Sequence, residues 1–594
     1  MYIKIYFLVA FFSWLSTLFG FGANAPSNLS IDLANTNWKF KTGDNKIWSI
    51  ATFDDAAWQN IKVGNPWESE ISPEFDGIAW YRTSVTIPKN WKRAVRRSDT
   101  LTVKLGKIDD ADETFFNGIQ IGASGKFPPE NITAYDEDRE YFIPAYLIKY
   151  DLPNTLAVRV ADWGGNGGMY AGEYTITPST WCNKTKIELV CSAANYSFTK
   201  DSPVQWSINI KNNSRDDIAG ILTIEVTTYS GLKVATQTKN VQILAKKDLK
   251  LDNLDFGTLP PDFYHISVKL RDLNGLEAKD KSGFAVAPDS LQNPTHIPAD
   301  FLNFWQQARA DLDSVAPDYK LTINKKFSTD SVDVYDVEMR SLGNVRVSGY
   351  YAQPKNKTNL PAILHVQGYS SVMMPSGLRE DVAQFFLNIR GHGNSKKDVN
   401  PGFPGYLLNG LDSAQNYIYR GAYMDCIRAV DFICSRAEVD TNRIAVMGGS
   451  QGGALSFATS ALDKRIKLCA PDVPFLSNFR LYFQIANWPA NEFKPYAMMR
   501  FKSMEKLLSL LDYFDVSHFT PLITCPVIMG VGLYDDICPP AINFSAYNNL
   551  ASTEKEYVLY PKSGHGLPSE QYNVKINWIL KHFSFNEGFK ELKN

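Results

Sequence analysis

Residues 444–462 read I-A-V-M-G-G-S-Q-G-G-A-L-S-F-A-T-S-A-L, and this stretch decides the fold of the C-terminal half. Apolar-rich residues, Ile444 to Gly448, precede Ser450, and an alanine-rich segment follows it. The pattern predicts a strand, a sharp turn and a helix, with Ser450 in the turn. Glycines on both sides would let a strained turn approach its neighbours without Cβ clashes.

The segments around this stretch alternate between helical patterns and apolar runs. Residues 300–312, D-F-L-N-F-W-Q-Q-A-R-A-D-L, form an amphipathic helical pattern. Strands are predicted in P-A-I-L-H-V-Q-G-Y (361–369), F-F-L-N-I-R-G (385–391), R-I-A-V-M-G-G-S (443–450), P-V-I-M-G-V-G-L (526–533) and E-Y-V-L-Y-P (556–561). Such alternation indicates a parallel sheet flanked by helices. Ser450 then occupies the G-x-S-x-G position where an α/β-hydrolase carries its nucleophile.

A serine in this turn needs a base to take its proton and a carboxylate to orient that base. In this fold the chain order is serine, then Asp or Glu, then histidine. His518, His565 and His582 follow Ser450. His582 lies in a terminal amphipathic pattern, and His518 precedes the best candidate acids. His565, in the glycine-flanked loop Y-P-K-S-G-H-G, is therefore the predicted base.

The candidate acids lie in the loop after the strand at 526–533. Asp535 and Asp536 both qualify by position. Asp472, in A-P-D-V-P-F, comes too soon after the serine, so we assign it to the substrate pocket, with Pro474 and Phe475.

Two backbone N–H groups must face the charge that develops on the ester oxygen. One is expected from Gln451, directly after the serine, and the other from Tyr369, in the turn after an early strand. The Tyr369 ring would also form a wall of the acyl pocket.

Short alternating segments broken by Gly, Pro, Asn and Asp fill the N-terminal half. In residues 26–180 they include W-Y-R-T-S-V-T-I-P (80–88) and a hairpin predicted at Asn117-Gly118. Residues 181–290 contain strands about ten residues apart, which is typical of an immunoglobulin-like sandwich. The chain is thus predicted to be multidomain, with two all-β sandwiches followed by an α/β-hydrolase domain at 291–594.

The first sandwich is dense in tryptophan. Exposed tryptophans can stack on sugar rings, but aromatic side chains bury large apolar areas and usually lie inside. We therefore favour a core role for most of them over a sugar-binding site. The second sandwich carries no motif, and we predict that it is a spacer.

Composition excludes several other classes. The 61 Lys and Arg against 63 Asp and Glu leave no basic patch for nucleic acid. Seven cysteines are an odd number and do not form a disulfide framework. Cys182 and Cys191 could pair across a hairpin, but free thiols are an equal alternative. The remaining cysteines show no metal-binding spacing, so we predict no metal and no cofactor.

The first 25 residues have an early lysine, a long apolar run and a small-x-small ending at Ala23-Asn24-Ala25. This pattern predicts a secretory signal peptide cleaved near Ala25, and hence a secreted or periplasmic protein. An uncleaved membrane anchor is the alternative, because the run approaches spanning length. No other stretch is apolar enough to cross a membrane.

Two family resemblances add to this interpretation. The W-Y-R and N-G segments with L-A-V-R-V-A-D-W-G-G-N-G-G-M-Y (156–170) resemble the galactose-binding-like jelly roll of glycoside hydrolase family two. Over about 295–585 the chain resembles carbohydrate esterase family seven, the acetyl xylan esterase and cephalosporin C deacetylase family. The matching motifs are R-G-H-G-N-S (390–395), N-Y-I-Y-R-G-A-Y-M-D-C-I-R-A (416–429), G-G-S-Q-G-G (448–453), D-V-P-F-L (472–476), L-D-Y-F-D (511–515) and G-L-Y-D-D-I-C-P-P (532–540).

The second resemblance implies Ser450 as nucleophile, Asp535 rather than Asp536 as acid, His565 as base, and the Tyr369 and Gln451 amides as oxyanion donors. The chain departs from the family at Gln367, where His is usual, and at Gly566, where Glu is usual. Family members tend to form closed hexamers. A homo-oligomer is therefore one partner hypothesis, although the extra β-domains would block or rearrange that assembly.

The predicted function is a secreted serine esterase that removes acetyl groups from xylan-derived oligosaccharides or other O-acetylated sugars through an acyl-enzyme on Ser450. One alternative is a prolyl-oligopeptidase-like peptidase, although the β half does not resemble a propeller. The other is a non-catalytic carbohydrate-binding protein.

Overall fold

The computed structural model describes residues 29–71, 75–128, 132–163, 167–292 and 294–583. The chain divides into two compact units. The first contains the chain up to Lys184 with the segments Ser214–Ile218 and Arg271–Glu277, and the second contains the rest. The predicted signal peptide, residues 1–25, lies outside the described residues. Across the described ranges, no helix is both long and apolar enough to span a bilayer.

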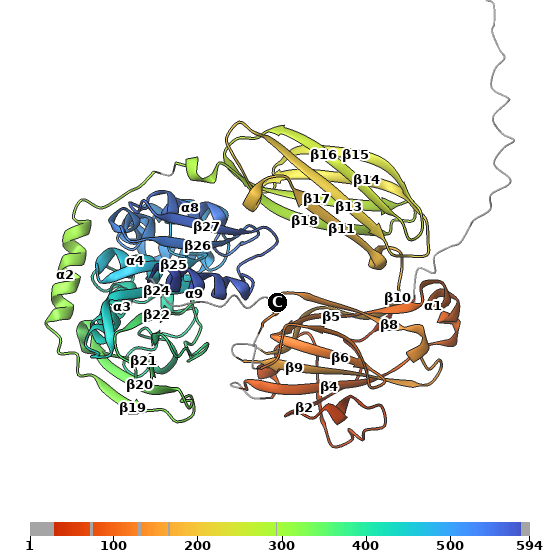
Figure 1. Cartoon of the computed structure of the whole chain (residues 1–594), viewed down its shortest axis with the longest axis horizontal. Helices are drawn as coiled ribbons and strands as arrows, with labels where there is room; N and C mark the ends of the chain where they lie inside the picture. Colours follow the sequence, from red (N-terminus) through yellow and green to blue (C-terminus); the bar gives the residue numbers. More distant parts are fainter. Residues whose placement is uncertain (1–28, 72–74, 129–131, 164–166, 293, 584–594) are drawn as a thin grey trace, which may run out of the picture. The chain divides into compact units, whose positions relative to one another are not determined.

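Two antiparallel sheets form a β-sandwich in the first unit (Figure 1). One sheet has the order β1-β10-β5-β8 and the other β3-β2-β4-β9-β6-β7. The strands are β1 (Ile31–Asp32), β2 (Trp38–Thr42), β3 (Gln59–Ile61), β4 (Gly77–Thr86), β5 (Thr100–Asp109), β6 (Ala111–Phe116), β7 (Ile119–Ser124), β8 (Asp138–Pro144), β9 (Pro153–Asp162) and β10 (Gly168–Pro178). A short helix, α1 (Lys92–Ser98), precedes β5.

Aromatic side chains fill the interior of this sandwich. Trp38, on β2, and Trp67, in the short segment Trp67–Ser69, are fully buried in the main core of the sandwich. Trp80, on β4, is fully buried in a second cluster with Trp58 and Phe115. The predicted core role of the tryptophans is thereby confirmed for these residues. Asn117 and Gly118 both have positive φ and connect β6 to β7, as the Asn-Gly pair predicts.

The immunoglobulin-like region consists of a three-stranded sheet, β11-β13-β16, and a five-stranded sheet, β12-β18-β17-β14-β15. The strands are β11 (Thr185–Cys191), β12 (Ser197–Phe198), β13 (Pro203–Asn212), β14 (Ile218–Thr228), β15 (Lys233–Ile243), β16 (Asp248–Thr258), β17 (Asp262–Asp272) and β18 (Glu277–Val286). Trp206 and Tyr264 pack against Phe284 in its core. Cys182 and Cys191 are free thiols, so the paired alternative is wrong.

A nine-stranded sheet forms the centre of the C-terminal domain, with the order β19-β20-β21-β23-β22-β24-β25-β26-β27. The pairs β19-β20, β20-β21 and β21-β23 are antiparallel. All later pairs in this order, from β23-β22 to β26-β27, are parallel. The strands are β19 (Lys320–Ile323), β20 (Val332–Ser341), β21 (Val345–Pro354), β22 (Leu360–Val366), β23 (Ala383–Asn388), β24 (Val439–Gly449), β25 (Ile466–Asp472), β26 (Val527–Gly532) and β27 (Lys555–Tyr560).

Helices cover both faces of this sheet. They are α2 (Phe301–Asp313), α3 (Ile418–Cys434), α4 (Gln451–Leu462), α5 (Phe479–Ile485), α6 (Ala490–Tyr496), α7 (Met504–Leu511), α8 (Pro540–Asn548) and α9 (Glu570–His582). Val446 packs in the core that contains α3 and α4, whereas its neighbours Ala445 and Met447 pack in the core that contains α9. Both faces are therefore buried, which explains the continuous apolar runs of the parallel strands.

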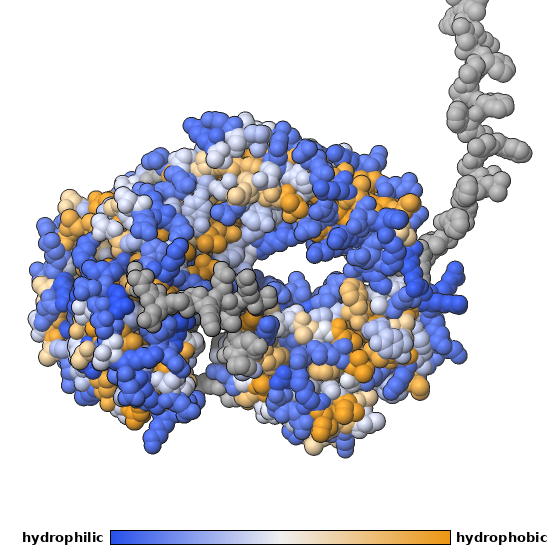
Figure 2. Space-filling view, viewed as in Figure 1, coloured by the Kyte–Doolittle hydropathy of each residue, from blue (hydrophilic) through white to orange (hydrophobic). Residues whose placement is uncertain are grey.

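The predicted fold class, two all-β sandwiches followed by an α/β-hydrolase domain, is confirmed. The face seen in Figure 2 is largely hydrophilic, with hydrophobic residues scattered among polar ones.

Candidate active site

Ser450 lies between the end of β24 and the start of α4, at φ 58° and ψ −119°. A positive φ is costly for a residue with a Cβ atom, so the surrounding structure must hold this turn. β24 lies between β22 and β25, in the parallel part of the sheet. The predicted strand, sharp turn and helix are confirmed, and the serine stands at the carboxyl end of a central strand, where α/β folds carry their ligand sites.

The glycines around Ser450 differ in what they permit. A Cβ atom on Gly448 or on Gly452 would overlap the Val366 carbonyl oxygen of β22. A Cβ atom on Gly449 would meet nothing closer than 3.9 Å. Close approach of the turn to β22 therefore requires glycine at 448 and 452, and not at 449.

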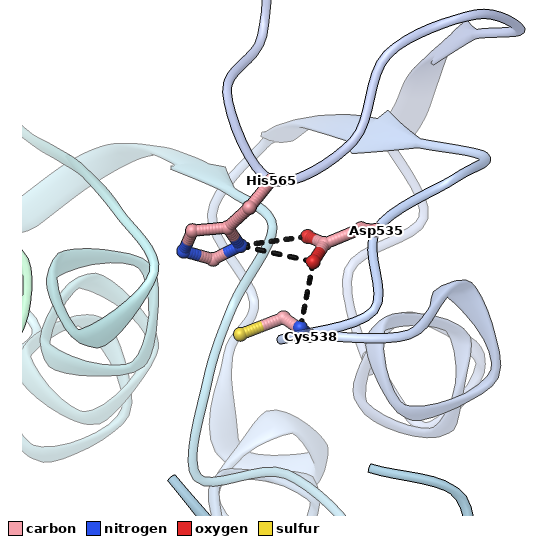
Figure 3. A group of neighbouring side chains, drawn as sticks. All are labelled: Asp535, Cys538 and His565. Atoms are coloured by element: carbon pink, nitrogen blue, oxygen red, sulfur yellow. Dashed lines mark hydrogen bonds and ion pairs between the residues drawn. The ribbon is translucent and has the colours of Figure 1, made fainter. Parts of the chain in front are cut away.

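Asp535 and His565 form a hydrogen-bonded pair (Figure 3). His565 Nδ1 lies 3.0 and 2.8 Å from the two Asp535 carboxylate oxygens. Asp535, in the loop after β26, is fully buried and also accepts the Ile537 and Cys538 backbone N–H groups at 2.9 and 2.7 Å. These donors stabilise the carboxylate charge and fix its orientation toward the imidazole.

Cys538 connects this pair to the serine. Burial raises the pKa of the Cys538 thiol well above its ordinary value, the Asp535 charge raises it further, and a hydrogen bond with the Ser450 side chain opposes these effects. Ligand atoms of Asp535, Cys538 and His565 lie within 4.8 Å of one another. The Asp535 carboxylate is already bound by His565 Nδ1 and by two backbone N–H groups, and these contacts fit a proton-transfer site.

A cavity of about 140 Å³ opens beside these groups. Ser450 and His565 both line it, so the structure brings the predicted nucleophile and base to one cavity. The other lining residues are mostly apolar: Gly368, Tyr369, Phe475, Trp488, Pro489 and Ile537. The predicted pocket positions of Tyr369 and Phe475 agree with this lining.

Two predicted pocket residues lie elsewhere. The Asp472 carboxylate accepts the Gln571 side-chain amide at 2.6 Å and pairs with the Lys575 ammonium, so it is held by α9 and does not line the cavity. Pro474 is absent from the lining because its backbone lies under Gly453, and its carbonyl accepts the Asn543 amide at 3.0 Å. Both residues therefore stabilise the structure around the Ser450 turn and do not form the substrate cavity.

The two predicted oxyanion donors lie on either side of the serine. Gln451 is the first residue of α4, whose first N–H groups have no partner within the helix and carry the positive end of its dipole. The Gln451 side chain is fixed by the Tyr419 hydroxyl, which donates to Oε1 at 2.6 Å, and by a 3.3 Å contact from Nε2 to His392 Nε2. Tyr369, in the turn after β22, lines the cavity from the opposite loop.

The sequence did not identify the aromatic wall formed by Trp488. Its ring centroid lies 6.0 Å from that of Tyr369, and the Tyr369 hydroxyl donates to Glu492 at 3.0 Å. Burial raises the pKa of both Tyr369 and Glu492. Trp488, Pro489 and Ile537 carry no catalytic motif, and only the Trp-Pro pair in an aromatic segment could have drawn attention to them.

The other two histidines that follow Ser450 have structural partners. His518 Nδ1 lies 2.8 Å from the Asp512 carbonyl oxygen, and its Nε2 accepts the His296 backbone N–H at 3.2 Å. His582 lies on α9 and contacts Glu554. Neither lines the cavity. Of the three candidates, only His565 pairs with Asp535.

A central serine on a strand-to-helix turn, beside an aspartate-bound histidine in an α/β sheet, defines a serine hydrolase, and the relatives of this chain place it in the carboxylic ester hydrolase class. Residues 290–582 match the acetyl xylan esterase (AXE1) family. The protein is 29% identical to the acetyl esterase Axe7A of Xylanibacter ruminicola over 346 residues, which are 55% of this chain and 76% of that protein. Through this region the chain belongs to the acetyl xylan esterase family.

Two further similarities concern different proteins. The solved acetyl xylan esterase from Paenibacillus sp. R4 is 32% identical, with 49% of this chain and 97% of that chain covered and a TM-score of 0.46. The β-galactosidase BoGH2A of Bacteroides ovatus is 24% identical over 163 residues, which are 25% of this chain and 18% of that protein.

Proposed function

We propose that the protein cleaves acetyl esters of xylan-derived oligosaccharides or other O-acetylated sugars, with Ser450 as nucleophile, His565 as base and Asp535 as acid. The observation that carries this proposal is the small cavity in which Ser450 and the Asp535-bound His565 meet apolar side chains. The names of the similar proteins support acetyl esters as the substrate class.

The chemistry follows from the positions of these groups. His565 Nδ1–H donates to Asp535, which leaves Nε2 free to accept the Ser450 hydroxyl proton as Oγ attacks the acetyl carbonyl. To do so the hydroxyl turns from the Cys538 thiol toward the imidazole. The Tyr369 and Gln451 amides stabilise the oxyanion. His565 then protonates the sugar oxygen as the C–O bond breaks. In the second half of the reaction His565 takes a proton from a water molecule, which attacks the acyl carbonyl. Acetate leaves, and His565 returns the proton to the Ser450 oxygen.

Cavity size sets the acyl specificity. A volume of about 140 Å³ with Phe475 and Ile537 in its wall accommodates a short acyl chain beside the serine. Misplacing the carbonyl by about 1 Å can cost about a hundredfold in rate, so longer acyl groups are poor substrates.

The alcohol side has a different character. Trp488 is 44% exposed although it lines the cavity, so one part of its surface faces solvent where the alcohol of the ester leaves the site. An exposed indole offers a flat apolar face for a sugar ring. This surface supports a carbohydrate alcohol over a peptide or a small aliphatic alcohol.

The N-terminal pattern M-Y-I-K-I-Y-F-L-V-A-F-F supports secretion or export to the periplasm.

The test is acetate release from acetylated xylo-oligosaccharides, compared with amine release from dipeptide anilides by the same preparation. The proposal predicts that the esters are turned over and the anilides are not, and that Ser450→Ala lowers ester turnover by several orders of magnitude. Preference for the anilides would support a peptidase instead. Full turnover by the Ser450→Ala variant would exclude the proposed nucleophile.

A further inference from the structure

The five-stranded immunoglobulin-like sheet contacts the loop that carries Asp535. Tyr229, directly after β14, donates its hydroxyl to the Asp535 backbone oxygen at 2.5 Å. His265, on β17, places Nε2 at 2.8 Å from the Leu533 backbone oxygen. Two side chains from outside the hydrolase domain thus hold the main chain on both sides of Tyr534.

Tyr534 itself is clamped by the same sheet. Its ring stacks on the His265 imidazole at a centroid distance of 4.0 Å and an interplanar angle of 9°. The Lys281 ammonium, on β18, lies 4.1 Å from the Tyr534 ring centroid. Stacking and a cation over the ring restrict the side chain next to the acid in the sequence.

The loop that carries His565 is held by β18. Gly283 N–H donates to the Pro561 carbonyl oxygen at 2.6 Å, and Asp280 pairs with Lys562 at 2.8 Å. A Cβ atom on Gly283 would lie only 2.5 Å from the Leu533 Cβ, so the close approach of the two domains depends on this glycine.

The two loops also hold each other. Tyr534 N–H donates to the Ser563 carbonyl oxygen at 2.8 Å, and Leu533 N–H donates to the Tyr560 carbonyl oxygen at 3.0 Å. A displacement of the acid loop would therefore be transmitted to the loop of the base. The two loops form one unit that rests on β14, β17 and β18.

The protonation states fit these contacts. Burial raises the pKa of Tyr229, and the charges of Asp535 and Asp536 raise it further, so its hydroxyl remains a donor. Burial lowers the pKa of His265, and the Lys281 charge lowers it further, while the Leu533 carbonyl acts in the opposite direction. The ring is therefore neutral near pH 7, with its one N–H directed at Leu533.

We propose that Tyr229 and His265 are positioning residues that hold the loop of the catalytic acid, and that the immunoglobulin-like domain is thereby part of the machinery of the esterase. This inference rests on the proposed triad. The sequence predicts that the immunoglobulin-like domain is a spacer. A spacer role does not account for the hydrogen bonds of Tyr229 and His265 to the backbone at Asp535 and Leu533.

The test uses the full-length protein with Tyr229→Phe and His265→Leu. Each change removes one donor to the acid loop and keeps a side chain of similar size. Because carbonyl and imidazole alignment controls the rate, we expect kcat for 4-nitrophenyl acetate to fall by about five- to fiftyfold with KM within about twofold. The rate of fluorophosphonate labelling should fall by the same factor, and His265→Gln, which can still donate to Leu533, should recover most of the loss.

Tyr264→Phe is the matched control. Tyr264 is next to His265, but its hydroxyl donates to the Pro260 carbonyl at 2.8 Å and its ring stacks on Phe284, within the same β-sandwich. This variant loses a hydrogen bond of that sandwich and should keep the wild-type kcat.

Two results would overturn the inference. If Tyr229→Phe and His265→Leu have the same kcat and labelling rate as Tyr264→Phe, the contacts are structural only. If Ser450→Ala, measured in parallel, retains activity, the triad on which the inference rests is itself wrong. An inactive Ser450→Ala variant with unaffected Tyr229→Phe and His265→Leu variants would contradict the positioning role alone.

Discussion

The Asp535 carboxylate accepts the Ile537 and Cys538 backbone N–H groups and contacts His565 Nδ1, and its negative charge is the property that the base requires. Asp535→Asn keeps the size of the side chain but removes the charge and presents an amide N–H to groups that are already donors. We expect kcat for acetate esters to fall by about 10³- to 10⁴-fold.

Asp536→Asn is the control for that experiment, because Asp536 is the adjacent carboxylate and has no contact with His565 among the hydrogen bonds of the described residues. Its kcat should stay within about twofold of wild type. A loss below tenfold in Asp535→Asn would remove Asp535 from the proposed triad.

The glycines of the serine turn give a second test at the residue scale. Gly452→Ala places a Cβ against the Val366 carbonyl oxygen. Because that oxygen belongs to the backbone, the clash can be relieved only if the serine turn or β22 moves. We expect a lower melting temperature by several degrees, since overpacking of this kind costs about 1–3 kcal/mol. Gly449→Ala, where the added Cβ has room, should melt close to wild type in the same thermal scan. Equal melting temperatures would show that the turn does not need its close approach to β22.

At the scale of elements, the loop between α5 and α6 presents Trp488 to the cavity. Trp488→Ala removes the exposed face that we assign to the sugar. KM for acetylated xylo-oligosaccharides should rise about tenfold, which corresponds to about 1.4 kcal/mol of lost binding. The kinetics with ethyl acetate, whose alcohol has no ring, should change little. An equal loss with both esters would indicate that Trp488 supports the cavity wall and does not contact the sugar.

The site residues that could be predicted are those marked both by a local strand or helix pattern and by the Ser-Asp-His order along the chain. Ser450 lies between an apolar run and a small-residue helix, and His565 follows the last strand, so the sequence alone could place both. Asp535 could be separated from Asp536 only by family resemblance. Asp472 was misassigned because its partners, Gln571 and Lys575, come from a helix about 100 residues later, and no local pattern reports such a contact.

The elements that the sequence did not reveal have weak periodicity or distant partners. β19 to β21 are the antiparallel start of the sheet, and β25 (Ile466–Asp472) lies where the sequence predicts no strand. The contacts of Tyr229 and His265 join residues about 270 to 310 positions apart. Such pairings depend on how two domains pack, which a period of 2 or 3.6 residues does not encode.

At the scale of the whole molecule, two buried histidines predict how stability depends on pH. Burial lowers the pKa of His365 to about 3 and that of His392 to about 4, from an ordinary value of 6.5. Between pH 6.5 and 4 the unfolded chain binds protons that the folded hydrolase domain does not, so stability falls as pH falls. Each group contributes a slope of up to about 1.4 kcal/mol per pH unit in that window.

The measurement is the melting temperature of the hydrolase domain at pH 7 and pH 5. The wild type should melt lower at pH 5, and His392→Gln should show a smaller drop, because glutamine does not titrate. An unchanged drop in His392→Gln would mean that His392 is not held neutral in the folded state.

The most direct test of the central claim is to label the full-length protein with a fluorophosphonate and identify the modified peptide by mass spectrometry. The proposed triad predicts one adduct, on Ser450, with labelling strongly slowed in His565→Ala and absent in Ser450→Ala. No adduct on a folded sample, or an adduct on a different residue that persists in Ser450→Ala, would contradict the assignment of this site.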